Sequence, residues 1–553
     1  NRTYGIWVLD ASTQLEANGN LVEGTLPWES SNGVQLAAGV SVEEAKSARI
    51  EGNAIVRNYS KGIGSFESEG ASVLSNLVEA TQAIAGTGDV GIGIEVYRGT
   101  AVISKNAVFT GIGHGIHVTA AGDATILGNR ISGPTGTEDD EGSMGILVTA
   151  GAKATVQADA LIELHDEAIG VDGEGTRLEA KRCLVYGTRP GTLLDIGLGI
   201  AVSDGAVAEV SDCAVSSNHD YGVFVGKASA SISSSLVERT QETSGVAVFS
   251  EASLDLSGSV IQSNPEAGII AGQGATLTAS GCLIADSKRV GLGGGIGVWA
   301  FGAAQGRLSG NAILRNAGAG VVAQTAGTVV DMNRNLVEGM RGDMGLVFFR
   351  GAVATLDGDA VVANRYGGIY AQDLGTRVTV RGTLVTDMLA NAVDGTYGVG
   401  VGADGASLEL NACLVEHNLT AGVGVWQTVL RISDTVVRGT EAGLAVEPQG
   451  SETHVFETGD GVLGLRGSDV IIDGSVLEDN ARAGVLLDDS TGRIAGNLCR
   501  NNQYGLAVSN SPELAVGDDN RLAGNAVENF LTDGSLPISI APLEVPSYEP
   551  PAL

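Results

Sequence analysis

The sequence is 553 residues long, and its 82 glycines, 11 prolines and 4% aromatic residues indicate a thin, layered core of small aliphatic side chains. Its 32 basic and 65 acidic residues give a formal charge of −33, which excludes nucleic acid and anionic membrane surfaces as main partners. The sequence contains no run of about 18 apolar residues, so no transmembrane helix is predicted.

From its first residues onward, the chain repeats a motif of glycine, an aliphatic residue, any residue and usually a second aliphatic residue. Clear copies begin at Gly93, Gly115, Gly199 and Gly222. The other copies begin at Gly5, Gly33, Gly62, Gly145, Gly170, Gly245, Gly268, Gly295, Gly320, Gly345, Gly368, Gly398, Gly422, Gly443, Gly464, Gly484 and Gly505. These 21 copies have a mean period of 25 residues, and periods of roughly 20 to 50 residues are typical of solenoids.

Each repeat also carries a small polar residue followed by two mostly apolar residues. This polar column consists of Asn20, Asn53, Asn76, Asn106, Asn129, Asp159, Cys183, Cys213, Ser235, Ser259, Cys282, Asn311, Asn335, Asp359, Thr383, Cys413, Thr435, Ser475, Asn497 and Asn525. Five positions later, many repeats carry a further asparagine, namely Asn58, Asn218, Asn264, Asn316, Asn364, Asn418, Asn480 and Asn502. Asparagine tolerates the left-handed backbone conformation of tight turns, so both columns are predicted to form turns.

Alternating segments of four or five residues, rich in Val and Ile, predict short β-strands rather than helices. Stacked coils would pair equivalent strands about 4.8 Å apart into parallel sheets with right-handed crossovers. A leucine-rich repeat would need a helical segment and a Leu-x-x-Leu-x-Leu motif, and a propeller would need blades of about 40 residues. The prediction is therefore an all-β parallel solenoid of about 21 coils.

The Gly-Ile-x-Val strands and the asparagine-rich column resemble the right-handed parallel β-helix repeats of the pectate-lyase-like superfamily. The resemblance covers residues 1–530, which are expected to form a single β-helix domain. Residues 531–553 contain Pro537, Pro542, Pro546, Pro550 and Pro551 and are expected to form a tail or cap, because proline cannot continue a β-ladder. The superfamily includes lyases, hydrolases, epimerases, phage spikes and adhesins, so the resemblance implies the fold and leaves the function open.

Four of the five cysteines, at positions 183, 213, 282 and 413, occupy the polar column, and Cys499 falls at an apolar core position. Buried free thiols are expected at all five. Only Cys183 and Cys213 lie in successive repeats, where a disulfide is sterically feasible, and their redox state stays open.

The spacing from a column residue to the next anchor glycine varies from 8 to 16 residues, whereas the spacing from anchor to column stays near 13 to 15. The insertions therefore leave one edge of the solenoid, where binding and chemistry are expected. Glu138, Asp139, Asp140, Asp166 and Glu167 lie on this edge and are the candidate ligands of a calcium ion. The alternative is that they are ordinary solvated acids of a strongly acidic protein.

Polygalacturonase-like members of the superfamily use aspartates and a Gly-His-Gly tripeptide, which the resemblance places at His114. No Asp-Asp pair precedes it, and no Arg-Ile-Lys follows it. A pectate-lyase pattern of calcium-binding acids and a basic arginine would require Asp139, Asp140 and Asp166 to converge with Arg189. Together with Asp195 in the following long loop, His114, Asp166 and Arg189 are the candidate catalytic residues.

Basic residues recur on the same edge over four successive repeats. They are Lys288, Arg289, Arg315, Arg341 and Arg365, with Tyr366 beside the last. Arginine and tyrosine suit sugar hydroxyls, carboxylates and pyranose faces, so a binding role is predicted. The alternative is a set of solvated surface charges.

The outward positions of the anchor strands carry Phe249, Trp299, Phe349 and Trp426 among small residues. They predict an apolar strip that packs against a partner chain or a second copy, or that binds a glycan. The alternative is that the proline-rich tail or neighbouring loops cover the strip.

Two functions are compatible with these patterns. The first is a non-catalytic extracellular or cell-surface protein that binds a polysaccharide or protein along the loop edge or the apolar face. The second is a polysaccharide lyase or glycoside hydrolase with a cleft on the long-loop edge. The candidate residues scatter from His114 to Arg365, which favours binding. An extracellular location is expected from the resemblance and from an acidic composition with 7 Lys to 25 Arg.

Overall fold

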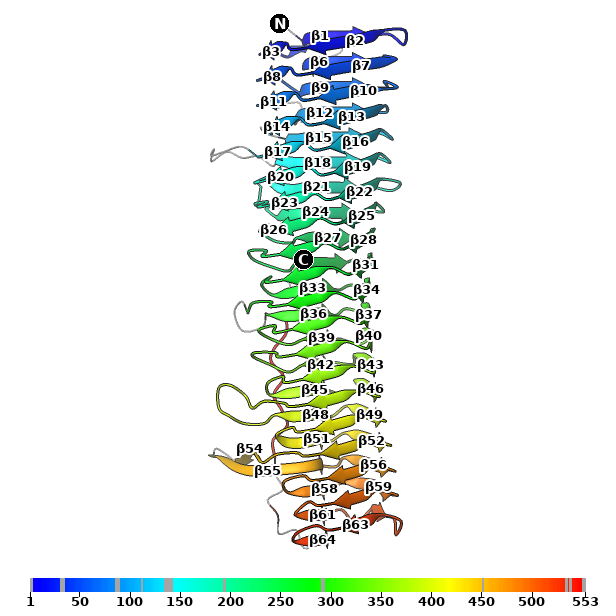
Figure 1. Ribbon diagram of the computed structural model, residues 1–553, viewed down its shortest axis with the longest axis vertical. Helices are drawn as coiled ribbons and strands as arrows, with labels where there is room; N and C mark the ends of the chain where they lie inside the picture. Colours follow the sequence, from blue (N-terminus) through cyan, green and yellow to red (C-terminus); the bar gives the residue numbers. More distant parts are fainter. Residues whose placement is uncertain are drawn as a thin grey trace. The chain divides into compact units, whose positions relative to one another are not determined.

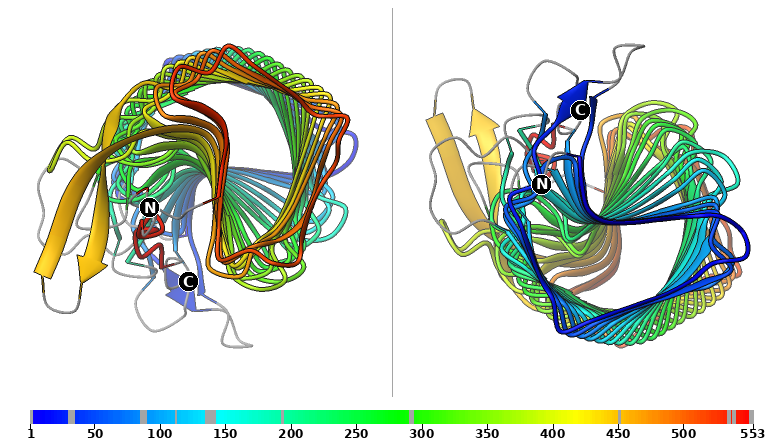
Figure 2. Two further views of the ribbon diagram at one scale, coloured as in Figure 1. Left: turned by 90° about the horizontal axis from the view of Figure 1, so that it is seen from below. Right: turned by 90° about the horizontal axis from the view of Figure 1, so that it is seen from above.

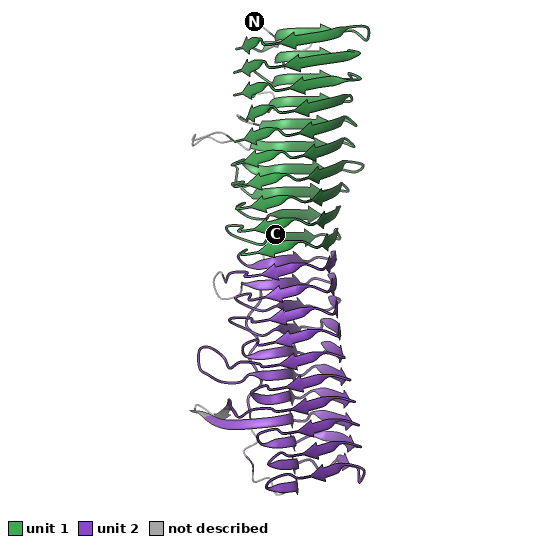
Figure 3. Cartoon of the chain, viewed as in Figure 1, with its two compact units in different colours: residues 1–264 green, residues 265–553 purple. Residues whose placement is uncertain are grey.

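The computed structural model describes residues 3–29, 35–84, 90–110, 113–133, 143–191, 195–289, 294–449, 452–532, 536 and 540–549. It separates the chain into two compact units, Asn1–Asn264 and Pro265–Leu553 (Figure 3). Both units consist of stacked short strands, which confirms the all-β parallel solenoid (Figure 1). No helix in the described ranges could cross a membrane. The predicted extent of the β-helix domain, residues 1–530, stays a prediction.

One coil contributes one strand to each of three parallel sheets, here called sheets I, II and III. In a typical coil these strands are β12 (Gly91–Tyr97), β13 (Thr100–Ser104) and β14 (Ala107–Phe109). β12 pairs in parallel with β9 (Lys61–Phe66) on one side and β15 (Gly113–Thr119) on the other. Strands of sheet II usually have five residues and those of sheet III three.

Sheet I carries the sites discussed below. In residues 1–264 it contains β1 (Tyr4–Leu9), β6 (Ala38–Glu43), β9, β12, β15, β18 (Ser143–Thr149), β21 (Asp166–Asp172), β24 (Gly197–Ser203), β27 (Val223–Gly226) and β30 (Val246–Phe249). In residues 265–553 it contains β33 (Ala267–Ala271), β36 (Ile296–Ala300), β39 (Val321–Gln324), β42 (Leu346–Phe349), β45 (Gly367–Gln372), β48 (Val399–Asp404), β51 (Thr420–Trp426), β55 (Glu452–Leu465), β58 (Ala483–Asp488), β61 (Tyr504–Ser509) and β64 (Glu528–Leu531).

The core of each coil is made of the inward aliphatic residues of its three strands. Ile94, Ile103 and Val108 are fully buried and stack on equivalent residues of the next coil, such as Ile116 and Ile126. Outward residues of sheet II alternate with them and are exposed, as in the Thr100–Ser104 strand. The period of two in the sequence therefore reflects strands of sheet II with one face toward the core and one face toward solvent.

The anchor glycines are required because successive coils approach too closely for a side chain. A Cβ on Gly93 would lie 2.5 Å from the carbonyl oxygen of Gly115 and 2.8 Å from Val108 Cγ1. A Cβ on Gly115 would likewise lie 2.7 Å from the carbonyl oxygen of Gly145. The repeated glycine thus records a main-chain contact between neighbouring coils.

Five of the predicted anchors were placed wrongly, and Gly33 lies outside the described residues. The close contact with the next coil belongs to Gly297, Gly400 and Gly461, not to Gly295, Gly398 and Gly464. In the coil of Gly170 the equivalent position is Ala168, whose carbonyl oxygen faces Gly145. The fifth, Gly443, begins β54 (Gly443–Gln449), which pairs antiparallel with the first half of β55. This hairpin projects away from the coils of its unit (Figure 2). Glycines two or three residues apart, and a hairpin strand with alternating aliphatic residues, satisfy the same local motif, so sequence spacing could not separate them.

Asparagines of the polar column form a hydrogen-bonded ladder between sheets II and III. Asn106 donates from Nδ2 to the carbonyl oxygen of Val73 and to Asn129 Oδ1, both at 2.9 Å. Its Oδ1 accepts bonds from the main-chain N–H and the Nδ2 of Asn76. The left-handed residue is the one before it, Lys105, with φ of 57°. The prediction that these asparagines adopt the left-handed conformation is wrong; they satisfy buried main-chain groups instead.

The second asparagine column does the same at the turn after sheet III. Asn364 Oδ1 accepts from the main-chain N–H of Met340, and its Nδ2 donates to the carbonyl oxygen of Val337, both at 3.0 Å. Here too the preceding residue, Ala363, is left-handed, with φ of 50°. Both columns are therefore structural.

The five cysteines are buried free thiols, as expected. Cys183 and Cys213 lie in adjacent coils, and the main-chain N–H of Cys183 donates to Cys213 Sγ at 3.3 Å. Both thiols therefore substitute for ladder residues.

Asp159 occupies the ladder as a buried acid, and burial raises its pKa to about 6. Its folded pKa exceeds the unfolded value of 3.8, so folding becomes less favourable as pH rises from 4 to 6. We expect Asp159→Asn to remove this loss, which is on the order of 2 kcal/mol. Melting curves should show the variant more stable than the parent at pH 7 and equal to it near pH 4. The exposed Asp123→Asn is the control, and equal curves for Asp159→Asn and the parent at pH 7 would contradict the expectation.

Candidate functional site

The structure describes part of the predicted calcium site. Glu138, Asp139 and Asp140 lie outside the described residues. Asp166 is fully buried at the start of β21, where its Oδ1 accepts a bond from the main-chain N–H of Gly191 at 3.0 Å. No group of three or more His, Cys, Asp or Glu side chains within the described ranges is arranged to hold a metal ion.

Glu167 follows Asp166 and is largely buried. Burial, followed by the charges of Asp166 and Asp172, raises its pKa to about 7. A calcium ion placed beside these acids would favour their charged forms.

The calcium site stays a prediction with a direct test. If it exists, isothermal titration calorimetry should detect calcium binding, and calcium should raise the melting temperature. Asp140→Ala with Asp166→Ala should abolish both effects. Asp123→Ala, on the outer face of sheet II, should leave them unchanged. Absence of heat from the parent protein would show that the acids are only solvated.

The other candidate catalytic residues do not form one site. His114 lies on β15, and it is in register with Met144 of the neighbouring strand β18. Glu167 is one strand further, about 10 Å from His114 along the stack. Arg189 meets Asp166 through its main-chain carbonyl, which accepts from the Asp166 N–H at 3.0 Å, while its guanidinium lies 3.9 Å from Glu163. Asp195 donates its main-chain N–H to the Gly191 carbonyl.

Three of the five basic residues of the loop edge are compensated by acids of the same unit. Arg315 and Arg341 both contact Asp286, at 2.8 and 2.9 Å, and Arg289 contacts Asp343 at 2.8 Å. Two further residues make main-chain contacts: Arg365 donates to the carbonyl of Ala390, and Lys288 forms a β-bridge with Pro265. The positive charge is thus neutralised at Arg289, Arg315 and Arg341, and the role of the five residues in binding stays a proposal.

The predicted apolar strip is not open. Trp299, Phe349 and Trp426 are at most 4% exposed. Trp426 Nε1 donates to the carbonyl of Ile540 at 2.8 Å, and the ring of Tyr548 lies 6.4 Å from Trp299 and 6.1 Å from Phe349. The prediction of a free docking face for a partner, a second copy or a glycan is therefore wrong for these residues. The alternative, cover by the proline-rich tail, is correct, because burying aromatic area within the chain removes it from water.

Two related aromatic residues are also engaged. The Tyr366 hydroxyl accepts from the main-chain N–H of Glu544 at 2.8 Å. Phe249, in the other unit, is buried and packs against Phe224 with ring centres 6.2 Å apart.

A polar cluster on the outer face of sheet I, consisting of Lys61, Glu95, His114, His117 and Thr149, is the strongest candidate site. Parallel register brings Lys61 of β9, Glu95 of β12, His117 of β15 and Thr149 of β18 onto adjacent strands. Lys61 Nζ lies 2.5 Å from Glu95 Oε2, and Glu95 Oε1 lies 3.8 Å from His117 Nδ1. The rings of His114 and His117 meet edge to face, with centres 5.4 Å apart.

Hydrogen bonding determines the tautomer of His117. Thr149 donates its hydroxyl to Thr119 Oγ1 at 2.9 Å, so it accepts from His117 Nε2 at 3.1 Å. The proton of neutral His117 therefore sits on Nε2, and Nδ1 keeps its lone pair. Neither His117 Nδ1 nor His114 Nδ1 has a hydrogen-bond partner among the described residues. His117 Nδ1 is therefore a buried acceptor without a partner, and His114 Nδ1 is a second buried polar atom without one among the described residues.

The cluster carries little net charge at neutral pH. Burial lowers the pKa of His114 to about 4, and burial with the neighbouring charges of His114 and Lys61 lowers the pKa of His117 to about 4. Both imidazoles are thus neutral, and the Lys61 ammonium is compensated by Glu95. The cluster therefore consists of two neutral imidazoles and a threonine hydroxyl beside the Lys61–Glu95 ion pair.

Only His114 of this cluster was a candidate from sequence. Glu95 and His117 are the variable residues of two successive Gly-Ile-x-Val motifs, where aliphatic or small residues prevail further along the chain. Charged and imidazole side chains at that position in adjacent repeats were the available signal. Its meaning depends on Lys61, whose contact with Glu95 comes from the pairing of β9 with β12.

Comparison with known proteins agrees with the fold. The family model described as the right handed beta helix region matches residues 1–131, 84–237, 198–344, 231–385 and 385–535. The chain belongs to the right-handed β-helix family. A search of curated proteins found no significant match.

Several solved structures are similar to this β-helix protein at low identity. The periplasmic alginate epimerase AlgG is 10% identical, with 69% of this chain and 77% of that chain covered and a TM-score of 0.28. The A-module of the Azotobacter vinelandii mannuronan C-5 epimerase AlgE6 is 13% identical, with coverages of 79% and 91% and a TM-score of 0.27. The alginate lyase AlyGC of family PL6 is 10% identical, with coverages of 96% and 96% and a TM-score of 0.21. Similarity at this level concerns the fold alone.

Proposed function

We propose that this β-helix protein binds a polysaccharide, without cleaving it, on the outer face of sheet I in residues 1–264, and that it does so outside the cytoplasm. The single observation that carries the proposal is the polar cluster around His117. The apolar strip no longer supports a binding role, because the chain's own tail covers it. The loop-edge arginines give weaker support, because carboxylates already pair with them.

The chemistry of the cluster suits sugar hydroxyls. A hydroxyl both donates and accepts, and the cluster combines the bare Nδ1 atoms of His114 and His117 with the Lys61 ammonium. Acidic polysaccharides are disfavoured on two grounds. The Lys61 charge is already compensated by Glu95, and the whole chain carries a formal charge of −33. Uncharged polysaccharides are therefore the expected ligand class.

The spacing of Glu95 and Glu167 argues against these two residues acting as a glycosidase pair. Glu95 and Glu167 lie three strands apart in sheet I, which is about 14 Å along the stack. Glycosidases hold their two carboxyl groups about 5 to 9.5 Å apart. Glu95 is also engaged by Lys61, so it is not a free base.

A lyase or hydrolase remains the second candidate function, and the raised pKa of Glu167 supports it. A carboxyl group with a pKa of about 7 can exchange protons at neutral pH. If this protein is an enzyme, it should cleave a polysaccharide, and Glu167→Gln should abolish cleavage without lowering the melting temperature.

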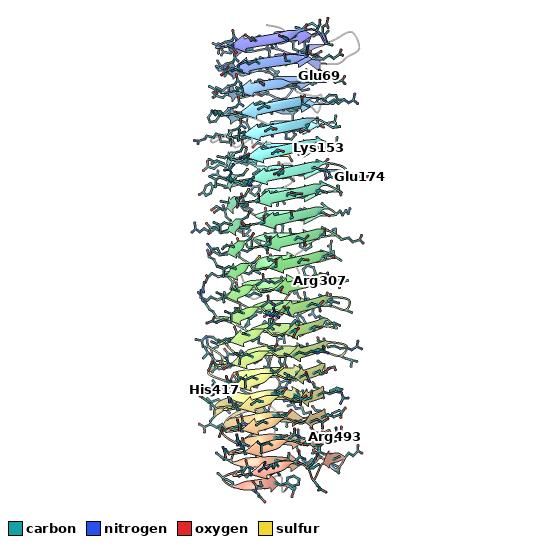
Figure 4. All side chains as sticks on the ribbon, turned by 45° about the vertical axis from the view of Figure 1, so that its right-hand side comes forward. Glu69, Lys153, Glu174, Arg307, His417 and Arg493 are labelled. Carbon is teal, nitrogen blue, oxygen red and sulfur yellow. The ribbon has the colours of Figure 1, made fainter. Side chains whose placement is uncertain are left out.

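The binding proposal is tested with affinity electrophoresis against a panel of neutral polysaccharides and polygalacturonate. The parent protein should be retarded by at least one neutral polymer and not by polygalacturonate. His117→Ala and Lys61→Ala should each weaken binding about tenfold, since each removes hydrogen bonds worth roughly 1 kcal/mol. Lys153→Ala, an exposed change on sheet II, is the matched control (Figure 4). Equal retardation of all four proteins would refute a role for the cluster.

A further inference from the structure

The C-terminal segment of residues 540–549, here called the strap, lies against aromatic side chains of its own unit, which belong to strands of sheet I or to the residues just before them. These side chains, here called the aromatic groove, are Trp299, Phe349, Tyr366, Tyr370, Tyr397 and Trp426. The strap forms neither a helix nor a strand. Among the described residues, the strap makes one main-chain hydrogen bond to another segment, from the Ala541 N–H to the Val446 carbonyl at 2.8 Å.

Side chains of the groove bind the main chain of the strap in sequence order. Trp426 Nε1 donates to the carbonyl of Ile540 at 2.8 Å, and the Tyr397 hydroxyl donates to the carbonyl of Ala541 at 3.2 Å. Next, the Tyr370 hydroxyl donates to the carbonyl of Leu543 at 3.0 Å, and the Tyr366 hydroxyl accepts from the N–H of Glu544 at 2.8 Å. Three carbonyls and one amide of five consecutive residues are therefore bound by aromatic side chains.

Three side chains of the strap anchor it. Ile540, Leu543 and Tyr548 are at most 2% exposed. The Tyr548 hydroxyl donates to Asp343 Oδ2 at 3.3 Å, and Asp343 is in turn held by Arg289 at 2.8 Å. The strap thus ends in a buried aromatic residue whose polar tip is satisfied by an ion pair, as burial of a hydroxyl requires.

Prolines punctuate the strap at positions 542 and 546. Proline restricts the chain to extended conformations and removes a donor, so carbonyl oxygens remain the groups to be recognised. Grooves lined by aromatic residues bind proline-rich extended peptides, whose low conformational entropy favours binding. The order of contacts along residues 540–548 fits that mode of recognition.

We propose that the aromatic groove is a peptide-binding site whose ligand is an extended, proline-punctuated segment ending in a tyrosine, and that residues 540–548 of this chain are its resident ligand. The strap then behaves as a separable ligand held in cis. The tether gives it an effective concentration in the millimolar range, so a free peptide of the same sequence competes poorly with it in the intact chain.

The test keeps the groove folded around its strap. A protease site is inserted directly after Thr532, and the full chain is cut only after folding. The released C-terminal peptide should remain bound during gel filtration at micromolar concentration. A fluorescein-labelled synthetic peptide of residues 540–549 should replace it, whereas the uncut chain should bind the labelled peptide at least 100-fold more weakly. A labelled peptide with Tyr548→Ala should bind at least tenfold more weakly than the parent peptide, and a scrambled peptide should not bind.

Variants of the groove guard against a folding artefact. Tyr370→Phe and Tyr397→Phe remove one hydroxyl each and keep the rings, so the fold should persist while the cut chain loses affinity for the labelled peptide severalfold. Equal binding of parent and scrambled peptides would overturn the proposal, as would equal binding to cut and uncut chains. Displacement of the strap by a neutral oligosaccharide, with no binding of the labelled peptide, would instead assign the groove to a glycan and also overturn it.

Discussion

Asn106→Ala is expected to destabilise residues 1–264 by about 4 kcal/mol, the largest effect of any single change considered for this protein. The asparagine amide makes four bonds in the ladder, to Asn76, Val73 and Asn129. Its removal takes the acceptor from the buried main-chain N–H of Asn76 and from one of the two Nδ2 bonds of Asn76, and it takes one donor from the carbonyl of Val73. Each such group costs roughly 1 to 3 kcal/mol.

Asn106→Ser is the matched variant. Serine occurs naturally in the same column, where Ser259 Oγ accepts from the main-chain N–H of Ser235 at 3.1 Å. We therefore expect serine at position 106 to recover about half of the loss. Urea denaturation followed by circular dichroism measures both variants. Equal losses for alanine and serine would show that side-chain volume, not hydrogen bonding, decides this position.

Gly93→Ala is expected to cost about 3 kcal/mol. The added methyl group would lie 2.5 Å from the carbonyl oxygen of Gly115, and relief requires the main chain of the neighbouring coil to move. Because coils of a solenoid stabilise only their neighbours, the damage should be local. Hydrogen exchange should rise in β12 and β15 and stay unchanged in coils further away.

Gly128→Ala serves as the control for backbone conformation. Gly128 has φ of 64°, and no atom lies within 4 Å of a Cβ built on it. Alanine there should cost only the left-handed backbone penalty, about 1 kcal/mol. A Gly128→Ala loss as large as that of Gly93→Ala would show that conformation, not close approach, explains the glycine repeat.

Repeat length, strand positions and parallel pairing could be predicted from the chain because every coil solves the same packing problem. Ile94, Val108 and their equivalents recur because each coil buries the same positions, and the anchor glycines recur where two main chains touch. Because the pattern is repeated in about 20 coils, an ambiguous segment in one coil does not change the predicted fold. It does not do so at single positions, as the hairpin beginning at Gly443 demonstrates.

The roles of individual residues were harder to predict when they depend on a partner in another coil. Asparagine was expected for its backbone freedom, whereas its amide bonds run between coils, as from Asn106 to Asn129. The aromatic positions of sheet I were correctly expected to face outward. For Trp299, Phe349 and Trp426, however, the cover comes from Tyr548 and the strap, more than 100 positions away from Trp426 in the sequence.

The candidate site shows the same division. Composition and periodicity alone determined the solenoid, its small aliphatic core and the edge from which insertions leave, because each is a property of every repeat. The cluster of Lys61, Glu95, His117 and Thr149 was decided only by the folded structure, which brings four coils into register. Burial keeps the imidazoles neutral, and strand pairing brings Lys61 beside Glu95. Neither effect can be deduced from a residue's own repeat, because both depend on the neighbouring strands.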